Sequence, residues 1–158
     1  MRKLVIEKAA VRNNMSVLKD RAQGAALYGV LTGNGSGLGA VCLARLLRDN
    51  GVGRFAVGTV EEARQLRENG FEDEEILMLR STVDREELEQ LVDLNVVCTV
   101  SSVDTGLALN AVAENRSTVV EAHIQVDTGM GFGGFLVGEP EKILLAYRSL
   151  PNVALSGI

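Results

Sequence analysis

The chain has 158 residues, of which 46% are hydrophobic and 23% are charged, and its formal net charge is −5. This balance is typical of one soluble globular domain, and the length is too short to expect two domains. The acidic charge argues against a nucleic-acid surface, because phosphate contacts need clustered lysine and arginine. No apolar run is long enough for a signal peptide or a membrane span, so we expect neither.

Both cysteines, Cys42 and Cys98, lie in apolar runs without CxxC spacing and without a nearby histidine cluster. Such surroundings are typical of buried, reduced thiols and not of a metal site or a disulfide framework. We therefore expect no bound metal ion and a cytoplasmic location.

The first elements alternate between helix and strand. Apolar residues recur at helical spacing over residues 5–22 and predict a helix, and the short apolar run 25–31 predicts a buried strand. Residues 32–39 form a glycine-rich loop. Residues 40–48 predict a second helix, which ends at Asn50-Gly51, a typical C-terminal cap.

The same alternation continues to residue 158. Thr59 and Asp84 lie where helices are expected to begin, and Gly70 follows an expected helix end. Apolar strands linked by helices indicate a parallel sheet covered by helices, in one α/β domain over residues 1–158. The remaining strands are predicted at Arg54–Gly58, Glu75–Leu79, Val96–Ser101, Val119–Asp127 and Val153–Ile158, and the remaining helices at Val60–Asn69, Asp84–Leu94, Val103–Asn115 and Pro140–Ser149.

The six predicted strands are too few for a closed barrel. A (β/α)₈ barrel needs eight strands and typically about 250 residues. The last segment, 153–158, is a bare apolar strand, whose edge would be left unpaired. The sheet is therefore either open or part of a truncated barrel, and we favour the truncated barrel.

The glycine-rich loop invites a second interpretation. Its segment Gly35-x-Gly37-x-x-Ala40 fits a relaxed dinucleotide-binding fingerprint between a strand and a helix, and Glu61 follows about twenty residues later. Alternating glycines produce this pattern by chance, however. Glu61 also falls inside a predicted helix instead of closing the second strand, so nucleotide binding is the weaker alternative.

Several motifs resemble those of alanine racemases. Residues 28–40, YGVLTGNGSGLGA, are similar to the family's YxVxKAxAYGHG, and residues 123–131, HIQVDTGMG, are similar to its HLKxDTGMxR. Between them, residues 55–67 resemble FAVATxEEAxxLR, residues 76–79 fit the third strand, and residues 156–158 fit the strand that precedes a THF segment. The resemblance covers the chain in order and displaces the dinucleotide interpretation.

This resemblance implies a partial TIM (β/α) barrel of about six parallel strands, of the alanine racemase N-terminal-domain type. It also implies relatives that bind pyridoxal phosphate (PLP), interconvert L- and D-alanine, and work as dimers. The family's C-terminal β domain supplies a second catalytic group, a tyrosine, and most phosphate-binding residues should lie beyond residue 158. We expect that domain to be absent from residues 1–158.

The departures from the family pattern gather at the cofactor site. The family's PLP-binding lysine corresponds to Thr32, whose hydroxyl can neither form an imine nor exchange an α-proton near neutral pH. The family's tyrosine and histidine in the first loop correspond to Ser36 and Leu38, the lysine of HLKxDTGM to Gln125, and the arginine after this motif to Phe132. We therefore expect no catalytic residue and no bound PLP. The expected vestigial pocket consists of Thr32, Asn34, Ser36, Gln125, Met130 and Phe132.

Other polar residues have a structural and a functional interpretation. We interpret the single histidine, His123, as a hydrogen-bonded structural residue and not as a proton carrier. Arg80 could offer a cation to an anionic ligand, but an ion pair with a neighbouring carboxylate is favoured. Asp127 is expected to organise the turn after its strand. Met130 and Phe132 either line a small apolar pocket or cap the barrel.

Three functional hypotheses remain. The favoured one is a catalytically inactive alanine-racemase-type barrel, a remnant or an engineered fragment, which forms a homo-oligomer through its open strand edges. The second is a module that binds a small neutral ligand in the vacated pocket. The third is a working PLP racemase that recruits Lys19 or Lys142, which is disfavoured because neither follows a predicted strand.

Overall fold

Six parallel strands follow one another in chain order in the computed structural model, which describes residues 4–158. They form two three-stranded sheets, β1-β2-β3 and β4-β5-β8. A parallel bridge between Leu77 and Val97 joins the two sheets, and the Met78 amide donates to the Val97 carbonyl at 2.9 Å. The strands are β1 (Tyr28–Val30), β2 (Arg54–Val57), β3 (Glu75–Met78), β4 (Cys98–Val100), β5 (Val120–Ile124) and β8 (Val153–Gly157).

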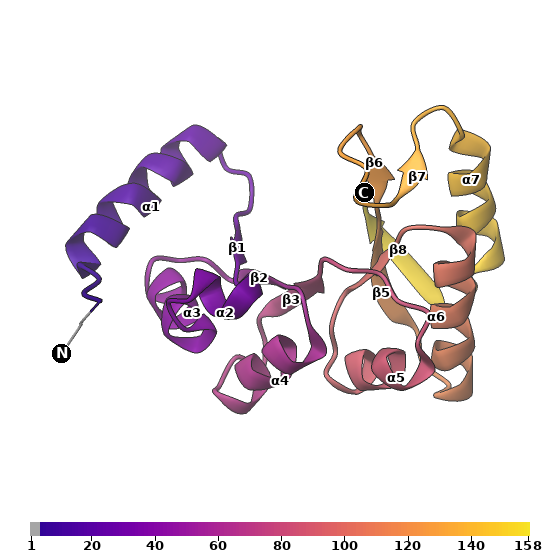
Figure 1. Cartoon of the computed structure of the whole chain (residues 1–158), viewed down its shortest axis with the longest axis horizontal. Coiled ribbons are helices and arrows are strands. Elements are labelled where there is room, and N and C mark those ends of the chain that lie inside the picture. Colours follow the sequence, from indigo (N-terminus) through magenta and orange to yellow (C-terminus); the bar gives the residue numbers. More distant parts are fainter. Residues whose placement is uncertain (1–3) are drawn as a thin grey trace.

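Helices connect these strands in the predicted alternation, from α1 at one end of the molecule to α7 at the other (Figure 1). Thr59 and Asp84 cap two of them as predicted, because their side chains accept the amides of Glu62 and Glu87. The helices are α1 (Lys8–Ala22), α3 (Ala40–Asp49), α4 (Val60–Glu68), α5 (Arg85–Asp93), α6 (Val103–Asn115) and α7 (Pro140–Ser149).

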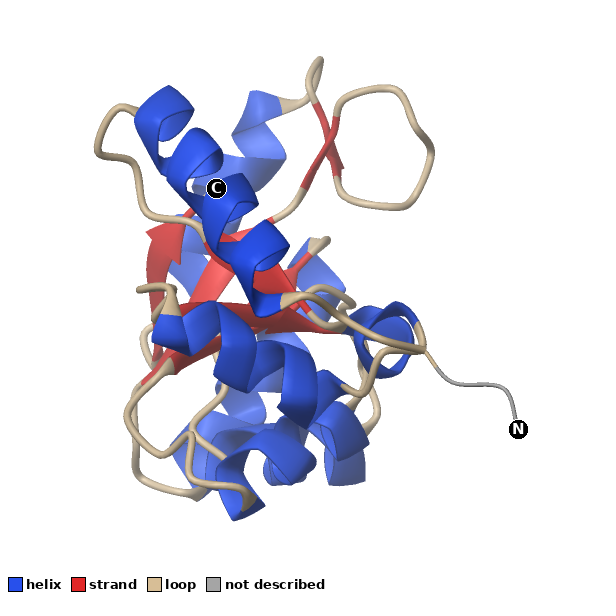
Figure 2. Ribbon diagram, turned by 90° about the vertical axis from the view of Figure 1, so that its left-hand side faces the viewer, coloured by secondary structure: helices blue, strands red, loops and turns tan. Residues whose placement is uncertain are grey.

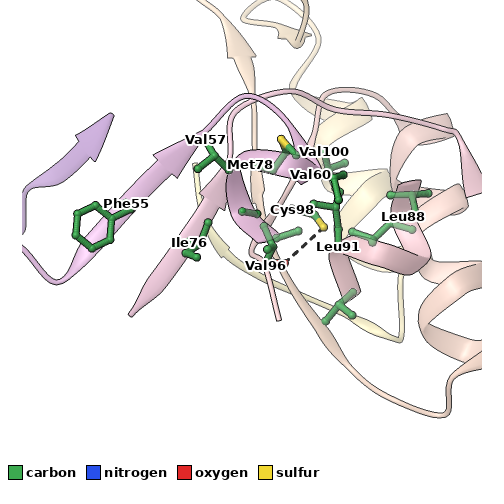
Figure 3. Close-up of a cluster of buried hydrophobic side chains, with 14 of the residues drawn as sticks. Phe55, Val57, Val60, Ile76, Met78, Leu88, Leu91, Val96, Cys98 and Val100 are labelled. Atoms are coloured by element: carbon green, nitrogen blue, oxygen red, sulfur yellow. Dashed lines mark hydrogen bonds between the residues drawn. The ribbon is translucent and has the colours of Figure 1, made fainter. Parts of the chain in front are cut away.

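The core lies between the strands and the helices that cover them. Alternate strand residues point to the helices and are buried, as expected for a pleated strand. Figure 3 shows this cluster, in which strand side chains meet Leu88 and Leu91 of α5. The strand residues in view are Phe55, Val57, Ile76, Met78, Cys98 and Val100, and Val96 lies just before β4.

The two cysteines differ in their surroundings. Cys98 is buried on β4, as predicted, whereas Cys42 is exposed on α3, so that part of the prediction was wrong. The reason is helical geometry: Ala40 and Ala44 turn inward on α3, and position 42 falls on the opposite side. Burial raises the pKa of the Cys98 thiol to about 12.

We expect alkylation to distinguish these thiols. Excess iodoacetamide at neutral pH should modify Cys42 readily and Cys98 only after unfolding, because the thiolate is the reacting species and Cys98 is held neutral and buried. Peptide mapping by mass spectrometry with and without denaturant measures this. Equal labelling of both thiols in the native protein would contradict the burial of β4.

The glycine-rich loop contains one short turn that the sequence did not predict, α2 (Thr32–Ser36). Gly33, Asn34 and Gly35 have φ values of 64°, 54° and 62°, which is the left-handed region. Residues with a β-carbon rarely adopt this region, and glycine and asparagine tolerate it best. The sequence GNG therefore permits this turn directly after β1.

The predicted strand 119–127 is interrupted. β5 ends at Ile124, and the next two residues form β6 (Val126–Asp127), which pairs in parallel with β7 (Phe135–Leu136). Figure 2 shows this short pair and its loop standing clear of the main sheet. The loop contains four of the chain's positive-φ glycines, which allow it to return over so few residues.

The row of six main strands has two free outer edges within residues 4–158, because β1 pairs only with β2 and β8 only with β5. α1 is loosely held beside the first edge: Met15 is its buried residue, while Val17 and Leu18 are about half exposed. None of the described helices combines the length and the hydropathy needed to cross a membrane.

Candidate functional site

The carboxyl ends of the parallel strands share one rim, and this is the face at which (β/α) barrels carry their active sites. Thr32 lies at this rim, separated from the end of β1 by one residue, and Gly58 follows β2. Arg80, Ser101 and Gln125 lie at the corresponding ends of β3, β4 and β5. The rim therefore collects the residues that the sequence singled out, and we take it as the candidate site.

Thr32 lies against the end of the neighbouring strand. A β-carbon built at Gly58 would be 3.2 Å from the Thr32 methyl carbon, so the two residues are in close contact. None of the described lysines follows β1. Lys19 lies beside Gly51, which precedes β2 at the opposite rim, and Lys142 pairs with Glu139 at 2.7 Å. The end of β1 carries a hydroxyl and no amine.

The carboxylate of Glu62 holds the glycine loop in place. It accepts the amide of Gly58 at 2.9 Å and the amide of Asn34 at 3.0 Å, and Asn34 in turn accepts the amide of Ala40 at 2.9 Å. Glu61, the acidic residue of the dinucleotide alternative, is exposed on α4. The sequence did not predict that Glu62 accepts these two amides. The only feature that pointed to Glu62 was its place in the EEA motif.

Replacing Glu62 by glutamine should loosen this loop. We expect Glu62→Gln to lower the free energy of unfolding by about 1–2 kcal/mol, because two hydrogen bonds to a charged acceptor become weaker or are lost. Urea unfolding measures this, with Glu61→Gln on the same helix as the matched control. Equal effects of the two substitutions would contradict the clamp.

The loop after β5 forms the other half of the site. The Asp127 carboxylate accepts the amides of Gly129 at 2.8 Å and Gly131 at 3.1 Å, which confirms the predicted turn. These backbone hydrogen bonds lower the pKa of Asp127, that from Gly129 most. The turn is thus stabilised by the ionised carboxylate and loses that support as the pH falls through the lowered pKa. Met130 and Phe132 are 76% and 78% exposed, so they neither line a pocket nor cap the barrel.

The expected vestigial pocket falls into two groups. Thr32, Asn34 and Ser36 lie in the loop after β1, and Gln125, Met130 and Phe132 lie at or after the end of β5, with three strands between them. Gln125 donates weakly to the Phe132 carbonyl at 3.4 Å, within its own group. With no amine at the end of β1 and with their side chains in two separate groups, these residues do not fit PLP. Over residues 4–158, no cluster of three or more metal-binding side chains is found.

Two further residues have the following surroundings. Arg80 forms an ion pair with Glu87, as predicted, and its hydrogen bond is the main cause of the lowered pKa of Glu87.

His123 was expected to be hydrogen-bonded, but its imidazole accepts or donates no hydrogen bond within the described chain. The ring lies instead against Gly157, where a β-carbon would come within 2.6 Å of it. Packing, and not hydrogen bonding, is the structural role of His123.

Comparison with known proteins identifies relatives of this arrangement. Residues 6–158 match the family described as "Alanine racemase, N-terminal domain". The alanine racemase of Clostridium tetani is 35% identical over 147 residues, which cover 92% of this chain and 37% of the relative. That of Carboxydothermus hydrogenoformans is 36% identical over 148 residues, covering 94% and 39%. The solved alanine racemase from E. faecalis superimposes with a TM-score of 0.82 at 33% identity, covering 97% of this chain and 42% of that one. The chain thus spans about two fifths of the length of these relatives.

Proposed function

Because this chain belongs to the alanine racemase family, we propose that it is a racemase-type barrel domain that does not itself catalyse the family reaction. The family reaction is the PLP-dependent interconversion of L- and D-alanine. The observation that carries the proposal is Thr32 at the end of β1, in contact with Gly58. A threonine hydroxyl cannot bind an aldehyde cofactor as an imine and is too weak a base to remove an α-proton near neutral pH.

The surroundings of Thr32 supply no substitute for the missing amine. The charged group that hydrogen-bonds to the loop is the carboxylate of Glu62, which accepts two backbone amides. Glu62 belongs to the EEA motif that this chain shares with the family, so the missing amine and not this carboxylate carries the proposal. Lys142 and Lys19, the candidates for a recruited amine, lie on α7 and α1 and neither contacts the loop after β1.

Hydrogen exchange at the α-carbon of alanine tests this proposal. L-alanine in D₂O with the protein and added PLP should lose its α-proton signal in ¹H NMR no faster than with PLP alone. A relative such as the alanine racemase from E. faecalis serves as the positive control. Exchange above the PLP background that depends on the concentration of this protein would overturn the proposal.

We further propose that residues 1–158 act as one domain and self-associate through the edges of β1 and β8. Unpaired edges present free backbone donors and acceptors, and a second copy can pair with them. Sedimentation at micromolar concentration should show a dimer or larger species, and a stable monomer would contradict this.

A cytoplasmic location is part of the proposal, supported by two cysteines that are both free thiols.

The alternative of a small neutral ligand in the vacated pocket loses its support at that place, because the pocket residues form two separate groups. A cavity elsewhere on the same rim supports a ligand better.

A further inference from the structure

A cavity of about 380 Å³ opens at the carboxyl end of β4, between the start of α6, the strand β7 and the helix α7. This volume lies within the range of roughly 300–1,000 Å³ that is typical of small-molecule sites. The cavity is on the rim where barrel sites lie, but it shares no residue with the expected vestigial pocket. A ligand at this cavity is therefore independent of the proposed loss of racemase chemistry.

The cavity is lined by both apolar and charged side chains. Val103, Phe135, Leu136 and Leu145 supply the apolar part, and Phe135 is only 4% exposed. The charged groups are Asp104, Glu139 and Lys142. An apolar surface with a few polar groups on one side is the usual construction of a site for a small ligand.

The hydroxyl groups at the entrance are already engaged. Ser101 Oγ forms a hydrogen bond of 2.6 Å with Ser81 Oγ, and Ser102 caps α6 by accepting the Thr105 amide at 3.1 Å. These two serines fix the shape of the entrance. Selection of a ligand is left to the three charged side chains.

Two of the three charged side chains form an ion pair, and the third has no partner among the described residues. Lys142 lies 2.7 Å from Glu139, and this hydrogen bond raises the pKa of Lys142, so the ammonium is charged at neutral pH. Both side chains are partly exposed and can accept another partner. Asp104 has no ion-pair partner anywhere in residues 4–158. The cavity thus offers one cation and one unpaired anion beside apolar side chains.

From this lining we propose that the cavity binds a free α-amino acid with a short apolar side chain, as a zwitterion. The ligand carboxylate would pair with Lys142, its ammonium with Asp104, and its side chain would cover Leu145 and Phe135. A simple anion would face the carboxylates of Asp104 and Glu139 with no ammonium to offset them, whereas a zwitterion brings an ammonium to Asp104 and a carboxylate to Lys142. An uncharged apolar ligand would leave both charges unused. Binding is non-covalent.

Titration of the intact chain with L-leucine tests the proposal by ¹H–¹⁵N NMR. Saturable shifts are expected at the amides around Ser102, Leu136 and Lys142, with a Kd below about 10 mM. Leucinamide, which lacks the carboxylate, and 4-methylpentanoate, which lacks the ammonium, should each bind at least about 10-fold more weakly. No saturable shift at these amides, or equal binding of either analogue, would overturn the proposal.

Matched variants locate the site. Leu145→Trp should fill the cavity and abolish the shifts, while Leu144→Trp should leave them unchanged, because Leu144 is on the same helix, about equally exposed, and does not line the cavity. Lys142→Gln should weaken binding by at least about 10-fold and Lys19→Gln should not. Thermal unfolding of each tryptophan variant confirms that it is folded. Leucine binding that survives Leu145→Trp in a folded protein would place the ligand elsewhere and contradict the assignment.

Discussion

Replacing Thr32 by lysine should restore alanine racemisation in a chimera that joins residues 1–158 to the part of Clostridium tetani alanine racemase that follows the matched region. We expect a rate at least about 100-fold above that of the same chimera with Thr32, since positioned acid–base groups typically contribute 10²–10⁴-fold. The fold supports this expectation, because position 32 lies at the end of β1 on the catalytic rim. Added PLP and a coupled assay for D-alanine measure it.

The control for this experiment is Thr32→Met, which has a long side chain without an amine. Both substitutions place a long unbranched side chain beside Gly58, so they should have similar effects on stability. Racemisation by the threonine or methionine chimera would show that the amine is dispensable. A folded lysine chimera without activity would contradict the prediction that the missing amine alone limits the reaction, and would assign the limit to the other departures, such as Gln125 and Phe132.

Replacing Arg67 by methionine should destabilise the fold more than any other single change at a charged residue of α4. Its guanidinium donates to the carbonyl of Phe71 at 2.6 Å and to those of Leu94, Glu74 and Asn95, each at 2.8 Å. These carbonyls belong to the turns before β3 and β4, so one side chain ties two strand–helix units together. We expect a loss of about 3 kcal/mol, or about 10 °C in Tm, because several carbonyls lose a charged donor.

Arg64→Met is the matched control for this substitution. Arg64 is on the same helix and contacts only the side chains of Gln90 and Glu61, so its replacement should cost less than about 1 kcal/mol. Burial lowers the pKa of Arg67, and Glu74 and Asp73 oppose this, but the guanidinium remains charged. The destabilisation by Arg67→Met should therefore be the same between pH 6 and pH 8, because an arginine side chain stays protonated throughout this range. Equal losses from the two variants would contradict the role of Arg67.

The periodic parts of the sequence predicted the fold well. Strands and helices alternate as expected, and the caps at Thr59 and Asp84 are present, because such signals are local. The left-handed turn after β1 could not be predicted, since several glycines in a row permit many backbone paths. Cys42 was misjudged because an apolar neighbourhood in sequence does not say which side of a helix a residue occupies.

The candidate site was predictable only in part. The pattern placed Thr32 directly after the first strand, at the rim where parallel strands end, but it placed Gln125 inside the strand 119–127, whereas β5 ends at Ile124. Contacts over long sequence separations were not visible. Glu62 reaches back to Asn34, and Arg67 reaches forward to Asn95, and neither bond has a periodic signature. The cavity beside Lys142 joins residues from α6, β7 and α7, which no local pattern brings together.

The most direct test is peptide mapping of the unmodified chain after incubation with PLP and reduction with borohydride. We expect no peptide to carry a stoichiometric adduct, and only the slow, scattered labelling that exposed lysines show, because no amine follows β1 at the rim. One lysine labelled completely and ahead of all the others would mean that the barrel still anchors the cofactor, and the account would be wrong.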